Sequence, residues 1–150
     1  MKKNQHQTPL EILLVEDNLA DVRLLVEVLQ GKDNYNMRFV EDGIEAMKYL
    51  KQKGSYASMP RPDIIILDLN LPKKDGRAVL KSIKNDANLQ CIPVIVLTTS
   101  TSEEDIAEAY ALHANCYICK PNDLDQFITV VNSIETLWFE NAVLPSQTCS

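Results

Sequence analysis

The sequence lacks the features expected of a membrane, nucleic-acid-binding or secreted protein. No apolar run approaches the ~18–20 residues that a membrane span needs. Lys and Arg number 15 against 21 Asp and Glu, a net charge of −6, which argues against binding nucleic acid or an anionic membrane, because both need a basic face. No small-residue cleavage site follows Lys2 and Lys3, so a cytoplasmic protein without a signal peptide is expected.

Cysteine is also scarce. Four cysteines in 150 residues are too few for a disulfide scaffold. Cys116 and Cys119 form one C-x-x-C pair, but residues three apart on a strand point to opposite faces. No second Cys or His pair completes a tetrahedral zinc site. Buried structural thiols are expected, with a zinc or redox site as the alternative.

The chain has no internal repeat or linker, so residues 1–150 predict one domain in which apolar patterns alternate. Short strand-like runs occupy residues 10–15, 37–40, 64–67, 93–97 and 116–119. Helical spacing marks residues 19–29 (ending near Gly31), 44–50, a segment with Val79, Leu80 and Ile83, residues 102–112, and 124–138. Asn18, Ser102 and either Asn122 or Asp123 are the expected N-caps. The alternation predicts a parallel sheet with helices on both faces, a three-layer α/β fold.

Chemically reactive residues follow four of the five strands. Glu16 and Asp17 follow the first strand, Asp68 the third, Thr98 ends the fourth and Lys120 follows the fifth. Each has an ordinary explanation as a helix cap, a turn, strand propensity or a solvated surface charge. Together they favour a site, because ligands of open α/β sheets bind beyond the carboxyl ends of the strands.

The residue types at this edge predict phosphoryl chemistry. Three clustered carboxylates repel one another and need a counter-charge. Oxygen ligands on a partly open site suit Mg²⁺. A carboxylate held on a metal, beside the Lys120 ammonium and the Thr98 hydroxyl, is placed to receive a phosphoryl group. We therefore expect Asp68 to be phosphorylated.

The segments "LLVEDN", "IIILDLNLPKKDG", "IPVIVLTTS" and "YICKP", in this order, resemble a response-regulator receiver domain of two-component signalling. The resemblance covers about residues 10–140, which leaves a tail at 141–150. It implies a flavodoxin-like receiver fold with a five-stranded, doubly wound sheet in the order 2-1-3-4-5. About a dozen residues follow Trp138, too few for an output domain, so none is expected.

By this resemblance Asp68 is the phosphoacceptor. Asp17 is implied as a direct Mg²⁺ ligand, and Glu16 as one that acts largely through water. The backbone carbonyl of Asn70 is implied to reach the metal. Asn70 and Ser100 occupy positions that tune dephosphorylation. The resemblance implies a phosphoacceptor that promotes its own phosphotransfer and dephosphorylation rather than an enzyme.

Further roles come from the same resemblance. Thr98 matches the switch hydroxyl and Lys120 the lysine that contacts the phosphoryl group. Pro121 matches a proline that is usually cis. Tyr117 matches the aromatic switch position, with ordinary strand packing as the alternative. Thr99 replaces a smaller residue and narrows access to the site.

The segments "KGSYASMPRPD", "ANCYICKPNDLDQF" and "SIETLWFENAVLP" resemble, more finely, the stand-alone regulators of bacterial and cyanobacterial phytochrome histidine kinases. A sensor histidine kinase of the phytochrome type is the implied partner. The apolar tail residues Trp138, Phe139, Val143 and Leu144 either fold back on the core or form a dimer surface. The expected homodimer uses the tail and the face of the fourth helix, fifth strand and fifth helix. The residues expected on that face are Ala109, Tyr110, Phe127 and Trp138.

Two other classes of protein are the alternatives. A metal-dependent phosphatase that forms an aspartyl-phosphate needs a second Asp two residues after the nucleophile, but Asn70 stands there and cannot act as acid or base. A receiver-like adaptor that works without phosphorylation would lack Asp17, Asp68 or Lys120, and all three are present.

Overall fold

The computed structural model describes residues 9–29 and 34–145. Five strands and five α-helices alternate along these residues: β1 (Leu10–Val15), α1 (Leu19–Leu29), β2 (Tyr35–Val40), α2 (Gly43–Leu50), β3 (Ile64–Leu67), α3 (Gly76–Lys84), β4 (Val94–Thr98), α4 (Glu103–Ala111), β5 (Cys116–Cys119) and α5 (Leu124–Ile134). A 3-10 turn, η1 (Gly54–Tyr56), follows α2, and a π-helical segment, η2 (Glu135–Asn141), follows α5. Gly31 and the tail residues 146–150 lie outside the described residues.

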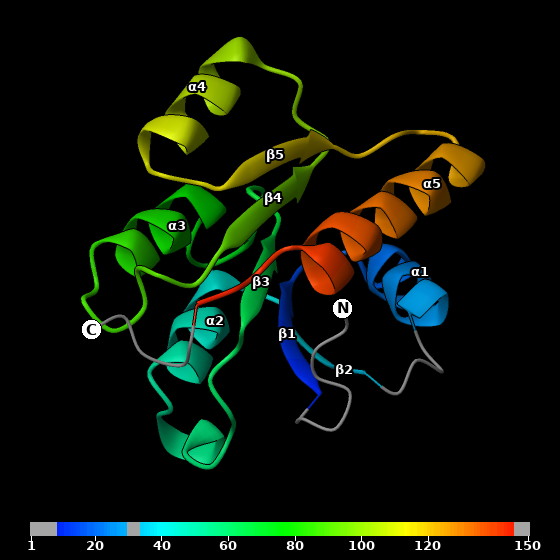
Figure 1. Cartoon of the computed structure of the whole chain (residues 1–150). Helices are drawn as coiled ribbons and strands as arrows, with labels where there is room; N and C mark the ends of the chain where they lie inside the picture. The colour runs from blue at the N-terminus through cyan, green and yellow to red at the C-terminus, as the bar shows by residue number, and fades with distance from the viewer. Residues whose placement is uncertain (1–8, 30–33, 146–150) are drawn as a thin grey trace.

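All five strands are parallel and lie in the order β2-β1-β3-β4-β5 (Figure 1). The three-layer α/β fold and the strand order are therefore confirmed. Helices α1 and α5 cover one face of the sheet, and α2, α3 and α4 cover the other. No helix in the described ranges is long and apolar enough to cross a membrane.

The central strand β3 is buried along its whole length and gives way to the site residue Asp68 at its carboxyl end. All four of its residues are buried, because helices cover both faces and alternate side chains enter opposite cores. Ile65 and Leu67 face α2 and α3, whereas Ile64 and Ile66 face α1 and α5. The buried run stops at Leu67, and the next side chain, that of Asp68, opens the site.

The predicted helix starts are confirmed by their hydrogen bonds. The Oδ1 atom of Asn18 accepts from the amides of Ala20 and Asp21 at 3.0 and 3.2 Å. The side chain of Ser102 caps α4, and that of Asp123 caps α5. These polar side chains satisfy amides that the first helical turn leaves unpaired.

Cys116 and Cys119 are free, half-buried thiols. Cys116 packs with the α1 and α5 core, and Cys119 Sγ lies 3.5 Å from the carbonyl oxygen of Ser100. Burial raises the pKa of the Cys116 thiol. This arrangement agrees with structural thiols on opposite faces of β5.

The C-terminal segment differs from the expected continuous helix. Helix α5 ends at Ile134, and η2 carries Trp138 and Phe139 onto the core beside α1 and α5. The Phe139 ring meets that of Tyr35 edge to face, with centroids 5.2 Å apart. Leu144 packs there too, so the described tail folds back on the core.

Two residues expected on a dimer face cannot contribute to one. Ala109 is 0% exposed and Phe127 5% exposed, since both face the sheet. Tyr110 remains at the surface, with 49% of its area exposed. Apolar spacing identifies a helix face, but it does not distinguish a face that covers the sheet from one that meets a partner.

Candidate functional site

The carboxylates that follow β1 and β3 meet at the carboxyl edge of the sheet. In the parallel register Val15 lies beside Leu67, so the residues that follow them are neighbours. The Asp68 amide donates to the Val15 carbonyl at 3.0 Å and fixes that alignment. One carboxylate oxygen each from Glu16, Asp17 and Asp68 lies within 4.8 Å of the others. The predicted acidic cluster is thus present.

Lys120 joins this cluster from β5. Its amide donates to the Thr98 carbonyl at 2.7 Å, and its side chain is 6% exposed. The ammonium lies 2.7 Å from Glu16 Oε1, 2.8 Å from Asp21 Oδ2 and 3.2 Å from Asp68 Oδ2. These three contacts use all three ammonium protons.

The electrostatics of the cluster favour a further cation. Burial raises the pKa of Glu16 to about 7, although its hydrogen bond with Lys120 opposes the shift. Burial alone would lower the pKa of Lys120, but hydrogen bonds with Asp21 and Glu16 raise it above its ordinary value. Asp17 is exposed beside its buried neighbours Glu16 and Asp68. Three carboxylate oxygens on an open side suit a divalent ion that keeps some of its waters.

The Thr98 hydroxyl is an unpaired donor at the same edge. Thr98 is 0% exposed, and its Oγ1 has no hydrogen-bond partner among the described residues. A buried polar group without a partner costs about 1–3 kcal/mol. The Thr98 hydroxyl is therefore free to donate to an acceptor placed at this edge.

A chain of hydrogen bonds leads from this edge to α4 and α3. The Tyr117 hydroxyl donates to the Ser100 carbonyl at 2.9 Å, and its amide donates to the Tyr110 hydroxyl at 3.1 Å. The Ser100 hydroxyl donates to Asp105 at 2.6 Å, and Asp105 forms a 2.8 Å ion pair with Arg77. Tyr117 therefore links the β4–α4 loop to α4 and does not serve only as strand packing.

The sequence of residues 12–132 matches the family model of the response regulator receiver domain. The chain belongs to this family. The match includes every residue of the acidic cluster, together with Thr98 and Lys120.

Two known proteins, Rcp1 and RcpA, resemble this receiver domain over nearly their whole length. Response regulator Rcp1 of Synechocystis is 46% identical over 144 residues, which are 95% of this chain and 98% of that protein. The crystal structure of the phosphorylated cyanobacterial phytochrome response regulator RcpA has a TM-score of 0.90 and 51% identity, and covers 93% of this chain and 100% of that chain. The structure of the Mn²⁺-bound form of Rcp1 has a TM-score of 0.89 and 48% identity, and covers 92% of this chain and 100% of that chain.

One expected feature of this receiver domain is wrong. No peptide bond in the described residues is cis, so the bond between Lys120 and Pro121 is trans. The two isomers of an X–Pro bond differ by only about 0.5–1 kcal/mol, so the dipeptide alone does not decide between them.

Two further predicted site residues lie at the surface. Asn70 is exposed, and its amide donates to Asp68 Oδ1 at 3.2 Å. Thr99, expected to narrow access, is also exposed.

Two residues of the site were missed by the sequence analysis. Asp21, in the first turn of α1, binds Lys120 more closely than Asp68 does. Its position three residues after the N-cap Asn18 was the available signal. Gly76 begins α3, and a Cβ added there would lie 2.3 Å from the Asp68 carbonyl oxygen. Only glycine lets α3 pack this closely beneath the Asp68 backbone.

Proposed function

We propose that this response regulator accepts a phosphoryl group on Asp68 from the phosphohistidine of a sensor histidine kinase, with Mg²⁺ bound. The observation that carries the proposal is the pairing of Asp68 with a buried lysine, beside the unpartnered Thr98 hydroxyl. A carboxylate can act as nucleophile, and both neighbours can donate to an anionic group attached to it.

In the proposed step an Asp68 carboxylate oxygen attacks phosphorus. A P–O bond forms as the P–N bond to the kinase histidine breaks, and the histidine nitrogen retains the bonding electron pair. Lys120 and the Thr98 hydroxyl then donate to phosphoryl oxygens. A bound Mg²⁺ supplies positive charge for the transferring oxygens. Asp17 and Asp68 would hold the ion directly, Glu16 would do so largely through water, and Asn70 through its carbonyl.

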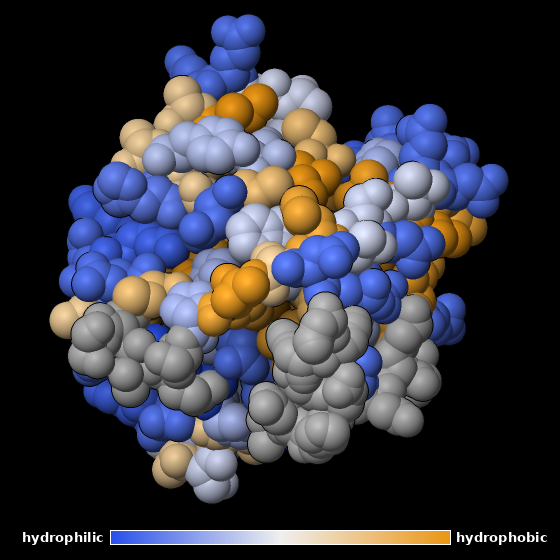
Figure 2. Space-filling view, viewed as in Figure 1, coloured by the Kyte–Doolittle hydropathy of each residue, from blue (hydrophilic) through white to orange (hydrophobic). Residues whose placement is uncertain are grey.

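The phosphorylated state would be transmitted through α4. Movement of Thr98 toward the phosphoryl group changes the end of β4, next to the loop whose Ser100 carbonyl binds Tyr117. Asn70, whose amide donates to Asp68, and Ser100, in the β4–α4 loop, are proposed to tune dephosphorylation. Self-association through α4, β5 and α5, together with the part of the tail that stays exposed at Val143, is the proposed readout. Figure 2 supports it, because apolar surface lies on the viewed face between α4 and α5.

The proposed kinase is of the phytochrome type. The support is similarity to RcpA, described as a cyanobacterial phytochrome response regulator, which this chain covers end to end at 51% identity. The coverage of Rcp1 and RcpA almost end to end supports a single-domain regulator. We propose that it acts by protein–protein contact in the cytoplasm. The net charge of −6 gives no support to a nucleic-acid partner.

The decisive experiment is incubation with acetyl phosphate and Mg²⁺, followed by intact-mass measurement. The wild type should gain the mass of one phosphoryl group, and Asp68→Asn should gain none. Asp125→Asn, an exposed acid in the first turn of α5, is the matched control and should behave as wild type. Normal phosphorylation of Asp68→Asn would show that the acceptor is another residue.

A further inference from the structure

Lys120 has no free donor for a phosphoryl oxygen. Its three protons go to Glu16, Asp21 and Asp68, and the two shorter distances are those to Glu16 and Asp21. An ammonium group has three donors. A phosphoryl group on Asp68 takes over the donor that Asp68 now accepts, so any second donor that it receives from Lys120 has to come from Glu16 or Asp21.

Asp21 is the carboxylate that Lys120 can release at the lowest cost. Its side chain is 20% exposed, against 2% for Glu16. A released carboxylate that reaches water recovers its hydration, whereas a buried one does not. Asp21 also lies outside the acidic cluster that could hold a metal ion, so its release leaves those ligands in place.

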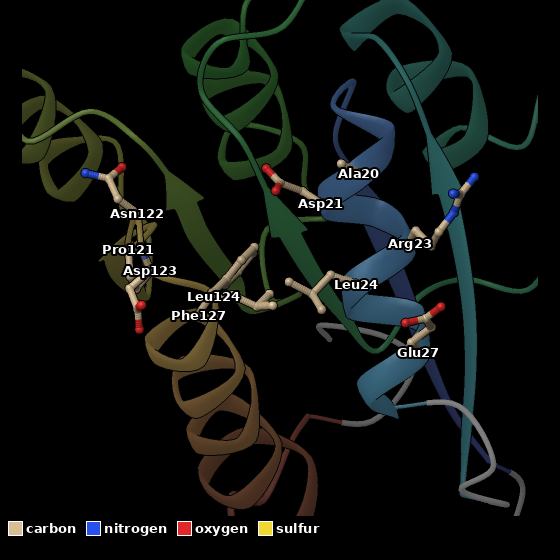
Figure 3. A pocket seen from close by; sticks show the side chains of 10 residues that line it. All are labelled: Ala20, Asp21, Arg23, Leu24, Glu27, Pro121, Asn122, Asp123, Leu124 and Phe127. Carbon is tan, nitrogen blue, oxygen red and sulfur yellow. The ribbon is translucent and has the colours of Figure 1, made fainter.

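The surroundings of Asp21 provide room for this movement. Asp21 and Leu24 project from α1 toward α5 and line an open groove with Pro121 and Leu124, as Figure 3 shows. Arg23 projects from the opposite side of α1 (Figure 3). The Asp21 carboxylate thus stands between the buried lysine on one side and a solvent-filled groove on the other.

We propose that Asp21 is a positioning residue that competes with the phosphoryl group for Lys120. In the resting protein it holds the ammonium, and on phosphorylation it yields a donor and turns into the α1–α5 groove. Its negative charge also repels the incoming dianionic group, and this repulsion weakens phosphoryl binding just as the competition for Lys120 does. This inference rests on the proposed function, and it assigns to a residue of α1 the control of how tightly the phosphorylated state is held.

Beryllofluoride, a phosphoryl mimic, tests the proposal in the full chain with Mg²⁺. Asp21→Asn should bind it about fivefold more tightly than wild type, the change that corresponds to about 1 kcal/mol for a partly exposed ion pair. Asp125→Asn removes the same charge from the first turn of another helix and should bind as wild type does. Unchanged or weaker binding by Asp21→Asn overturns the proposal. A wild type that binds no beryllofluoride overturns the proposed function as well.

Three further measurements separate positioning from a general charge effect. In a Lys120→Ala background, Asp21→Asn should lose most of its effect on affinity; the same fold-change in both backgrounds contradicts action through Lys120. In the metal-free wild type, the Lys120 ammonium should give a slowly exchanging ¹⁵N signal, and Asp21→Asn should speed that exchange. In wild type, the ¹³C signal of the Asp21 carboxylate should shift when beryllofluoride and Mg²⁺ are added. A carboxylate signal that stays unchanged means that Asp21 keeps its hydrogen bond, and overturns the proposal without any variant.

Discussion

Lys120→Met should strongly destabilise the metal-free protein. The variant leaves the buried carboxylates of Glu16 and Asp68 without the ammonium that now lies 2.7 and 3.2 Å from them. Removing one partner of a buried ion pair costs about 3–5 kcal/mol. Because the pKa of Glu16 is already raised to about 7, that carboxyl can take up a proton at neutral pH for less than about 1 kcal/mol. We therefore expect a loss of about 3 kcal/mol, or about 6–12 °C in Tm for a chain of this size.

The loss should grow with pH. The pKa of Glu16 rises from 4.5 to about 7 on folding, so the folded wild type binds more protons and loses stability as the pH rises through that range. Without Lys120 the folded-state pKa rises further, and the variant continues to lose stability above neutral pH. The difference in the free energy of unfolding between wild type and Lys120→Met should thus be larger near about pH 8 than near about pH 5.5.

Urea unfolding followed by far-UV circular dichroism in EDTA measures these differences. Lys81→Met, which changes an exposed lysine of α3, is the matched control and should stay close to wild type. Millimolar Mg²⁺ should restore part of the stability of Lys120→Met, because a cation that binds only the folded state stabilises it. A variant within about 1 kcal/mol of wild type at the higher pH would refute the assignment of Lys120 as the counter-ion of this site.

Three further outcomes are expected. Gly76→Ala should lower the free energy of unfolding in urea by about 1–3 kcal/mol, because the new Cβ would lie 2.3 Å from the Asp68 carbonyl oxygen. Hydrogen bonds from Ser100 and Arg77 lower the pKa of Asp105. Asp105→Asn should therefore lower the free energy of unfolding above about pH 3.8, and the difference from wild type should shrink at lower pH in urea unfolding. Tyr117→Ala, which removes the hydroxyl bonded to the Ser100 carbonyl, should abolish any effect of beryllofluoride on self-association in sedimentation velocity; an unchanged effect would exclude Tyr117 as the link to α4.

Most of the site could be predicted because strand ends in a parallel sheet share one edge. Glu16, Asp68 and Lys120 each directly follow a strand, and the register of the sheet brings them together. The position of Asp21 could not be read in the same way, because a residue inside a helix faces whatever packs beside that helix. Its contact with Lys120 depends on how α1 lies across the sheet.

The sequence determined the alternation of strands and helices and the buried central strand through its hydrophobic pattern, and the acidic cluster through the residues that directly follow the strands. Those features follow from local periodicity and from the rule that parallel strands end at one edge. The tertiary structure alone decided which apolar faces remain exposed, as with the burial of Ala109 and Phe127. It also decided the return of the tail onto the core and the trans bond before Pro121. Each of these depends on small energy differences between competing packings, and contacts between residues far apart in the sequence settle them.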